Sequence, residues 1–199
     1  MKLVLASRNK NKLRELGTIL QGLGLEVALE SELGFDVEVE ETGATFEENS
    51  LLKAQAVLAA TGLPAIADDS GLMVDALGGA PGVYSARYGH KLSDSERVQY
   101  LLGNMKDVPD GARGAKFVCV ITCLWPDGRK IAARGECRGE ILRAPRGQNG
   151  FGYDPVFWLP QYGRTFAELP EEEKNAISHR GNALREFCRI YKEEFLHDK

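Results

Sequence analysis

Residues 40–71 constrain this chain more than any other stretch. They begin with an acidic pair, Glu40-Glu41, continue through a segment that carries Lys53, and end with a second acidic pair, Asp68-Asp69. Mg²⁺ in proteins prefers a few carboxylate oxygens together with water and substrate phosphates. Two acidic pairs on either side of a lysine therefore indicate a magnesium–polyphosphate site.

A helix is predicted between the two acidic pairs. Thr45-Phe46-Glu47-Glu48 has the pattern of a capping box, so the helix is expected to begin there and to continue to about Ala60. Asn49 and Lys53 are four residues apart and therefore share one polar stripe of this helix.

The second acidic pair follows a short run of small residues. Ala65–Ala67 is predicted to be a strand that carries Asp68 and Asp69 at its carboxyl end, where open α/β sheets place ligand sites. Adjacent residues of an extended strand face opposite ways, so one aspartate is expected to face a given cleft wall unless Ser70-Gly71 turns the chain. The alternative for any single acidic pair is a solvated surface.

The remaining pattern favours an α/β fold with a mixed sheet and helices on both sides. Early strands and helices alternate, whereas strands cluster in the middle around the hairpin signal Pro126-Asp127-Gly128. We expect a single domain over residues 1–199, or two closely fused lobes. Strands are predicted at 2–6, 25–29, near 35–39, at 65–67, 116–125, 129–134, 137–142 and 155–158, with helices at 10–21, 45–60, 93–101 and from about 178.

Composition excludes several classes of function. The chain is 43% hydrophobic and 27% charged, with a net charge of −4, which is typical of a soluble globular protein and argues against a general nucleic-acid binder. It has no run of about 18 apolar residues, so no membrane span is expected. The apolar run at the N-terminus is too short for a signal peptide, so we expect a cytoplasmic protein. Its four cysteines are then expected to be buried free thiols.

A second candidate site lies at the first predicted helix. The free N–H groups and the dipole at a helix N-terminus favour an anion. The pattern is not a Walker A loop, and the alternative interpretation is a capped surface helix with solvated lysines. The residues that could contact phosphate here are Ser7, Arg8, Asn9, Lys10, Asn11 and Lys12.

A third candidate site combines aromatic and cationic residues near the end of the chain. The glycine-rich loop 147–154 carries Phe151 and Tyr153, and an aromatic ring there could stack on a planar base. Lys174, His179 and Arg180 would add donors near a helix start. The alternative is a turn with core aromatics and a structural histidine. A serine hydrolase is not indicated, because the chain has no nucleophile elbow.

Several of these stretches match one family together. The chain resembles the inosine triphosphate pyrophosphatase family, also described as noncanonical purine nucleoside triphosphate pyrophosphatases. The match extends over almost the whole chain. Its segments are Ser7-x-Asn9-x-x-Lys12-x-x-Glu15, Glu40-Glu41-Thr42-Gly43, Thr45-Phe46-x-Glu48-Asn49-x-x-x-Lys53-Ala54, Ala67-Asp68-Asp69-Ser70-Gly71-Leu72, Gly78-Gly79-x-Pro81-Gly82-x-Tyr84-Ser85-Ala86-Arg87, Gly150-Phe151-Gly152-Tyr153-Asp154-Pro155-x-Phe157 and Lys174-x-x-x-Ser178-His179-Arg180.

The resemblance implies an elongated, twisted mixed sheet with flanking helices, and two lobes around a central cleft. It also implies a homodimeric, Mg²⁺-dependent enzyme that hydrolyses ITP, dITP and XTP between the α and β phosphates. The products would be the nucleoside monophosphate and pyrophosphate, so the enzyme would remove deaminated purines from the nucleotide pool. The expected partner is the small-molecule nucleotide, with no nucleic acid and no membrane.

The resemblance also assigns roles to residues. Asp69 is the expected proton acceptor for the attacking water, and Glu40 and Asp69 are the expected metal ligands, with Asp68 and Glu41 as further candidate carboxylates. Residues 7–12 and Lys53 would contact the phosphates. The nucleoside would be held by Ser70, Phe151, Gly152, Tyr153, Asp154, Lys174, His179 and Arg180.

Base choice would depend on position 6 of the purine. Hypoxanthine and xanthine present an oxygen acceptor there, whereas adenine presents an amino donor. A donor such as Arg180, or a backbone N–H, would be left unpaired by adenine, and this gives strong discrimination. Two other functions stay open from the residues alone: a pyrophosphatase of similar fold for other modified nucleotides, such as pyrimidine nucleotides, and a nucleotide sensor without turnover.

Overall fold

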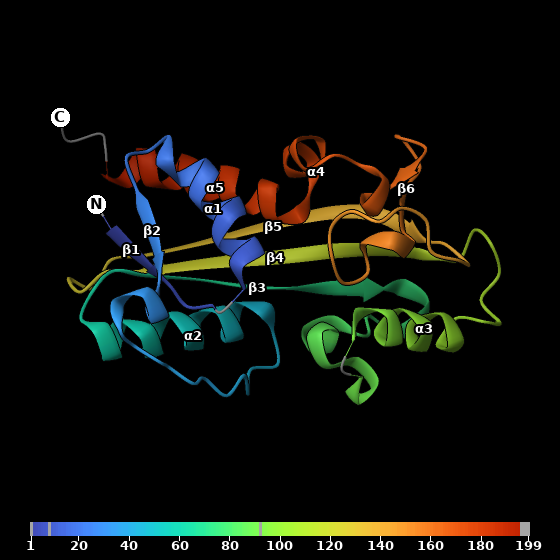
Figure 1. The fold of residues 1–199 in the computed structure, drawn as a ribbon, viewed down its shortest axis with the longest axis horizontal. Helices are drawn as coiled ribbons and strands as arrows, with labels where there is room; N and C mark the ends of the chain where they lie inside the picture. Colours follow the sequence, from blue (N-terminus) through green and yellow to red (C-terminus); the bar gives the residue numbers. More distant parts are fainter. Residues whose placement is uncertain (1, 8, 92, 196–199) are drawn as a thin grey trace. The chain divides into compact units, whose positions relative to one another are not determined.

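The computed structural model describes residues 2–7, 9–91 and 93–195. The chain forms two compact units, and each is described by itself (Figure 1). Unit 1 contains the residues up to Asp69, Cys119–Gly135 and the residues from Arg180 onward. Unit 2 contains Ser70–Val118 and Glu136–His179.

The strands belong to one mixed sheet in the order β2-β1-β3-β4-β5-β6-β7. β1 pairs in parallel with β2 and β3, whereas β6 pairs antiparallel with β5 and β7. The predicted α/β class with a mixed sheet is therefore confirmed. The strands are β1 (Lys2–Leu5), β2 (Glu26–Leu29), β3 (Ala65–Val74), β4 (Gly114–Leu124), β5 (Lys130–Ile141), β6 (Phe157–Leu159) and β7 (Arg164–Thr165).

Five α-helices and several short 3₁₀ segments are found in the described part of the chain. The α-helices are α1 (Lys10–Gln21), α2 (Phe46–Thr61), α3 (Asp94–Asn104), α4 (Glu171–Ile177) and α5 (His179–Phe195). The 3₁₀ segments are Glu30–Leu33, Asp75–Leu77, Gly82–His90, Asp154–Val156 and Phe166–Glu168. None of the described helices combines the length and the apolar character needed to cross a membrane.

Unit 1 is built around β1, which has parallel neighbours on both sides. In Figure 1, α1 and α5 lie on one side of the strands of unit 1, and α2 lies on the other. Leu16 and Leu20 of α1 and Phe187 of α5 are fully buried in one apolar cluster with Leu3 and Leu5 of β1. A second cluster joins Val4 to small residues of α2 and β3. Burial of both faces explains why β1 is almost continuously apolar.

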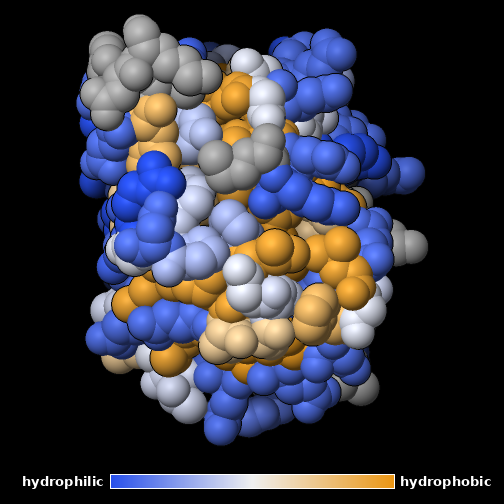
Figure 2. All heavy atoms as spheres, turned by 90° about the vertical axis from the view of Figure 1, so that its left-hand side faces the viewer, coloured by the Kyte–Doolittle hydropathy of each residue, from blue (hydrophilic) through white to orange (hydrophobic). Residues whose placement is uncertain are grey.

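Unit 2 has its own apolar core. Phe157 of β6 and Phe166 are fully buried and pack against Phe117 of β4, with ring centroids 4.6 and 5.8 Å from that of Phe117. In Figure 1, α3 and α4 lie on opposite sides of the strands of this unit. The side of unit 1 seen in Figure 2 shows hydrophobic patches between hydrophilic side chains, and the exposed Leu63 is one large apolar side chain of this unit.

The start of α2 confirms the predicted capping box. Thr45 Oγ1 accepts a hydrogen bond from the Glu48 backbone N–H at 3.1 Å, and Glu48 Oε2 accepts one from the Thr45 N–H at 3.2 Å. Gly62 ends the helix in the left-handed conformation, with φ of 67°. The local sequence therefore determines both ends of the helix that carries Lys53.

Several predicted boundaries are wrong. β3 continues to Val74 instead of stopping before Asp68, and residues 35–39 form an irregular segment instead of a strand. Residues 129–134 and 137–142 are one strand, β5, because every second residue from Ile131 to Cys137 is buried, Gly135 included. The short helix α4 was not predicted. The four cysteines are free thiols as expected, although Cys188 is only half-buried.

Candidate active site

The two aspartates of β3 lie in the interior of this long strand and contact different helices. Lys12 of α1 approaches Asp68, with Nζ 2.9 Å from Oδ1, whereas Lys53 of α2 approaches Asp69, with Nζ 2.8 Å from Oδ1. Since α1 and α2 lie on opposite sides of the strands, the expected alternation of adjacent strand residues is confirmed. Asp68 and Asp69 therefore take part in two separate groups of charges.

The group around Asp68 is buried and balanced in charge. Arg180 Nη2 lies 3.2 Å from Asp68 Oδ2, and Arg180 Nη1 lies 2.6 Å from Glu15 Oε2. Burial alone would raise the pKa of Asp68, but Lys12 and Arg180 together hold that pKa well below its usual range. Two carboxylates thus face two cations, and Arg180 is only 3% exposed. The Arg180 guanidinium was expected to contact the purine base. In the structure it is instead paired with Glu15 and Asp68 of unit 1.

The group around Asp69 is the more accessible of the two. Lys53 Nζ lies 2.9 Å from Glu41 Oε1 as well as 2.8 Å from Asp69 Oδ1, so one ammonium bridges two carboxylates. Burial raises the pKa of Asp69 despite the opposing effect of Lys53. Burial would lower the pKa of Lys53, yet Asp69, Asp68 and Glu41 leave it raised. A carboxylate with a raised pKa is better suited to accept a proton than an ordinary aspartate.

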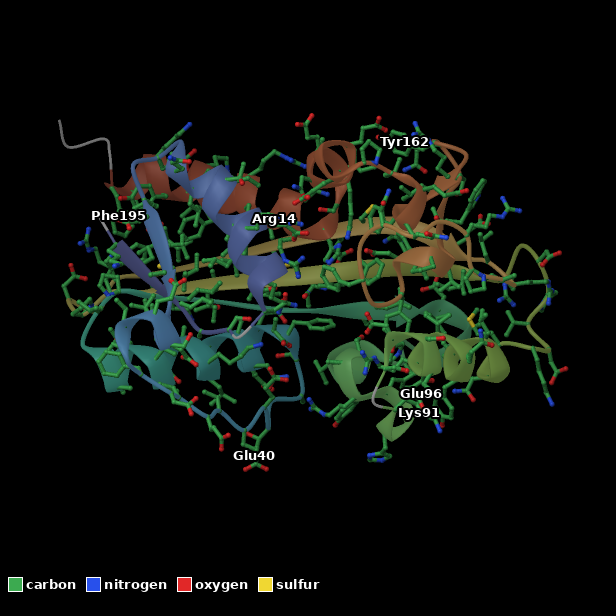
Figure 3. The ribbon with its side chains drawn as sticks, in the orientation of Figure 1. Arg14, Glu40, Lys91, Glu96, Tyr162 and Phe195 are labelled. Atoms are coloured by element: carbon green, nitrogen blue, oxygen red, sulfur yellow. The ribbon has the colours of Figure 1, made fainter. Side chains whose placement is uncertain are left out.

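A pocket of about 640 Å³ opens beside Lys12 and Lys53. Its other charged lining residues are all acidic: Glu30, Glu38, Glu40 and Glu41. Glu40 is exposed and projects outward from its loop (Figure 3), whereas Glu41 turns toward Lys53. Of the first acidic pair, the structure therefore brings Glu41 rather than Glu40 to the ion pair with Asp69.

The N-terminal residues of the predicted phosphate site surround the start of α1. Ser7 lines the pocket, and its Oγ accepts a hydrogen bond from the Asn9 backbone N–H at 3.1 Å. Asn9 Oδ1 in turn accepts one from the Lys12 N–H at 3.4 Å. Arg8 lies outside the described residues, and Lys10 and Asn11 are described only as the backbone of the first turn of α1.

Sequence reasoning missed the support behind Glu41. Asn49 is fully buried, and its Oδ1 accepts a hydrogen bond from the Gly43 N–H at 2.8 Å. A Cβ on Gly43 would lie 2.6 Å from Asn49 Oδ1 and 2.7 Å from Glu48 Cβ, so only glycine fits there. Asn49 and Lys53, one turn apart on α2, thus hold both ends of the segment 41–43. The sequence signal that could have revealed this support is the polar stripe that Asn49 and Lys53 share on α2.

Replacing Gly43 with alanine should displace this segment and with it Glu41. Overpacking of this kind costs about 1–3 kcal/mol, so we expect kcat/KM to fall roughly tenfold while the protein stays folded. Gly17→Ala is the control, because a Cβ at Gly17 of α1 has no neighbour within 4 Å. Steady-state kinetics with thermal denaturation test this. Equal kinetics for both variants would show that the segment 41–43 does not need its present position.

Unit 2 gathers most of the residues expected to hold the nucleoside. Lys174 Nζ lies 2.6 Å from Asp154 Oδ2, and the same oxygen accepts the Phe151 backbone N–H at 3.0 Å. Gly150 adopts φ of 75°, and a Cβ there would overlap Asp154 Oδ2. Lys174 also lies over the Phe151 ring, 4.9 Å from its centroid. The glycine-rich loop is therefore fixed by a buried ion pair.

The other residues of unit 2 that were expected to hold the nucleoside differ in how deeply they are buried. Tyr153 is buried, and its hydroxyl donates to the Ser85 carbonyl at 2.8 Å, so its ring belongs to the core. The Gly152 N–H donates to Asp94 Oδ2 at 2.7 Å. His179 is buried and stacks on Phe117, with centroids 4.7 Å apart. Ser70 and Phe151 are half-buried.

The comparison with known proteins decides the family. The model of the Ham1 family matches residues 3–190. The chain belongs to the Ham1 family. It is 52% identical over 193 residues to a dITP/XTP pyrophosphatase from Thermus thermophilus, covering 97% of this chain and 93% of that one. It is 52% identical over 187 residues to the dITP/XTP pyrophosphatase of Escherichia coli K12, with coverages of 92% and 94%.

Solved structures agree with this membership of the Ham1 family. A HAM1 protein from Coxiella burnetii superposes with a TM-score of 0.89 at 45% identity, covering 97% of this chain and 99% of that one. The Ham1 protein of Staphylococcus aureus gives a TM-score of 0.89 at 42% identity, with coverages of 98% and 100%. The resemblance inferred from the sequence motifs is therefore confirmed.

Proposed function

We propose that this Ham1 protein hydrolyses the noncanonical purine nucleoside triphosphates ITP, dITP and XTP to the nucleoside monophosphate and pyrophosphate. In a cell this activity removes deaminated purines from the nucleotide pool. One structural observation supports it most: Lys12 and Lys53 line the pocket of unit 1, and Lys53 Nζ lies 2.8 Å from the buried carboxylate of Asp69, whose pKa is raised by burial. The names of the bacterial relatives support the choice of dITP and XTP.

The residues beside Lys53 fit a divalent cation, and we propose Mg²⁺. Among the described residues no three His, Cys, Asp or Glu side chains form a ready-made metal group. However, Asp69 Oδ2 is buried without a hydrogen-bond partner in the described part of the chain, so it has acceptor capacity left. Asp69 with Glu41, and Glu40 at the pocket edge, would hold the ion. When bound, Mg²⁺ would offset phosphate charge and polarise the phosphoryl oxygens.

The protein's own residues would carry out the proton transfer and the positioning. Asp69 accepts a proton from the attacking water, whose oxygen forms the new bond to phosphorus, while the bond between the α and β phosphates breaks and pyrophosphate leaves. Ser7, Lys12 and Lys53 line the pocket and bind the phosphate oxygens. Asp68 faces α1 and Arg180, so we assign it to holding Lys12 rather than to the ion.

In unit 2 we propose that Phe151 stacks on the purine and that the surrounding loop supplies polar contacts to the nucleoside. Phe151 is half-buried, whereas the Tyr153 ring belongs to the core. Ser70, Gly152, Asp154, Lys174 and His179 are the other residues to which we assign nucleoside contacts or support. Arg180 would support the site through Asp68, because its guanidinium is already occupied by two carboxylates.

The wider properties follow from the same family likeness and remain proposals. We propose that residues 1–199 act as one catalytic domain and that the enzyme is a homodimer in the cytoplasm, where the nucleotide pool is found. The partner is the small-molecule nucleotide alone, with neither nucleic acid nor membrane. Sedimentation of the purified protein tests the dimer.

A nucleotide panel tests the proposed function. With Mg²⁺, ITP, dITP and XTP should each give one pyrophosphate per nucleoside monophosphate, and ATP should react about 10⁴-fold more slowly in kcat/KM because of its 6-amino group. A chelator should abolish turnover. Release of single phosphates would contradict the proposed reaction. Faster turnover of dUTP or dTTP than of ITP would instead indicate a pyrimidine enzyme, and tight binding of ITP without turnover would indicate a sensor.

A further inference from the structure

Lys53 occupies the space between two carboxylates that come from different parts of unit 1. Glu41 belongs to the irregular segment before α2, and Asp69 belongs to β3. The Lys53 ammonium lies 2.9 Å from the first and 2.8 Å from the second. The side chains of Lys53 and Asp69 are only 11% and 9% exposed, so this bridge is largely shielded from water. A single positive charge thus joins two oxygen ligands of the kind that a divalent cation uses.

Lys12 provides a contrast within the same pocket. It contacts one carboxylate, Asp68, and Asp68 also has Arg180 as a cationic partner. If Lys12 moved toward a ligand, Asp68 would keep a positive charge beside it. Within the described part of the chain no second cation forms an ion pair with Asp69, so departure of Lys53 would leave a buried negative charge. A buried charge without a partner is strongly unfavourable.

We propose that the Lys53 ammonium and the divalent cation compete for Glu41 and Asp69, and that Lys53 moves to the substrate phosphates when the cation takes its place. This inference rests on the proposed function, which supplies the metal requirement. Lys53 already lines the pocket in which we place the phosphates. The exchange replaces ion pairs and changes no covalent bond.

The exchange has a consequence for the order and strength of binding. Without the cation, the two carboxylates hold Lys53 and weaken its attraction for phosphate. With the cation bound, Lys53 loses these partners and becomes available to the triphosphate. Because coupling between two ligands is reciprocal, the nucleotide should then also strengthen binding of the cation. Lys53 would in this way limit occupation of the acidic pocket when no substrate is present.

Binding of Mn²⁺ alone, followed by electron paramagnetic resonance without nucleotide, tests the competition. Lys53→Met removes the competing charge and nearly keeps the side-chain length, so it should bind Mn²⁺ at least about tenfold more tightly than the wild type. Lys12→Met is the matched control, because it removes the same charge from the same pocket but not from these carboxylates. Its affinity should stay within about threefold of the wild type, since its distance to Asp69 is greater.

A crystal structure of the wild type with Mn²⁺ alone provides a second measurement that does not depend on the folding of any variant. We expect the ion at Glu41 and Asp69, with Lys53 Nζ moved away from both. An ion found there while Lys53 stays in place would overturn the inference, as would equal effects of the two lysine variants on affinity.

Two variants distinguish failure of the exchange from failure of the proposed function. If Asp69→Asn abolishes Mn²⁺ binding but Lys53→Met binds no more tightly than the wild type, the exchange is wrong and the proposed function stands. If Mn²⁺ binds neither the wild type nor Lys53→Met, the exchange is wrong together with the metal requirement of the proposed function.

Discussion

Asp69→Asn should reduce kcat with ITP by about 10²–10⁴-fold, which is the contribution typical of a positioned general base. The amide keeps the shape of the side chain but cannot accept the proton of water at neutral pH. Lys53 keeps Glu41 as a partner in this variant, so the folded state should survive. KM should change much less than kcat, because the phosphate-binding lysines remain.

The kinetics of Asp69→Asn should be measured together with its thermal midpoint. Asp127→Asn is a suitable control, since Asp127 lies in an exposed turn and pairs with Arg129 of the same hairpin. Its kcat should equal that of the wild type. Near wild-type turnover of Asp69→Asn in a folded protein would remove Asp69 from the proton transfer and would contradict the proposed mechanism.

Asp68→Asn should have the largest effect on stability. The Asp68 side chain is fully buried between Lys12 and Arg180, and removing its charge leaves two cations facing a single carboxylate, Glu15. Breaking a buried ion pair in this way costs about 3–5 kcal/mol. For a chain of this size we therefore expect the thermal midpoint to fall by roughly 10 °C.

The pH dependence of stability separates the charge of Asp68 from its shape. The pKa of Asp68 is lower in the folded than in the unfolded protein, so its contribution is complete above the unfolded pKa of about 3.9 and is lost as the pH falls toward the folded value. The wild type and Asp68→Asn should thus differ most at neutral pH and converge in acid. A constant difference from pH 7 to pH 2.5 in denaturant titrations would contradict the ionic role.

The helices of unit 1 could be predicted because local signals determine them. The Leu16 and Leu20 stripe predicts α1, and the capping box at Thr45 predicts the start of α2. The fold class followed from the order of these elements, and the family from motifs spread along the chain. Such signals act between residues close in sequence, where propensity and capping are sufficient evidence.

The interior position of Asp68 and Asp69 in β3 could not be predicted in this way. Asp-Asp-Ser-Gly reads locally as the end of a strand, because these residues favour turns. Here cations from three helices neutralise the buried carboxylates, and one of them, Arg180, is 112 residues away in sequence from Asp68. Lys53 likewise pairs with Glu41 and not with Glu40. The hydrogen bond from the Gly43 N–H to Asn49 positions this segment, and a motif in the sequence does not show that contact.

The roles assigned to the site residues remain predictions, and one measurement tests them most directly. It is a crystal structure of the protein with Mg²⁺ and an ITP analogue whose bridging oxygen between the α and β phosphates is replaced by NH. We expect the triphosphate to lie in the pocket of unit 1, with Lys12 and Lys53 on its oxygens and Asp69 beside the reacting phosphorus and the ion. A triphosphate bound elsewhere, far from an Asp69 that is still paired to Lys53, would contradict the proposed catalytic site.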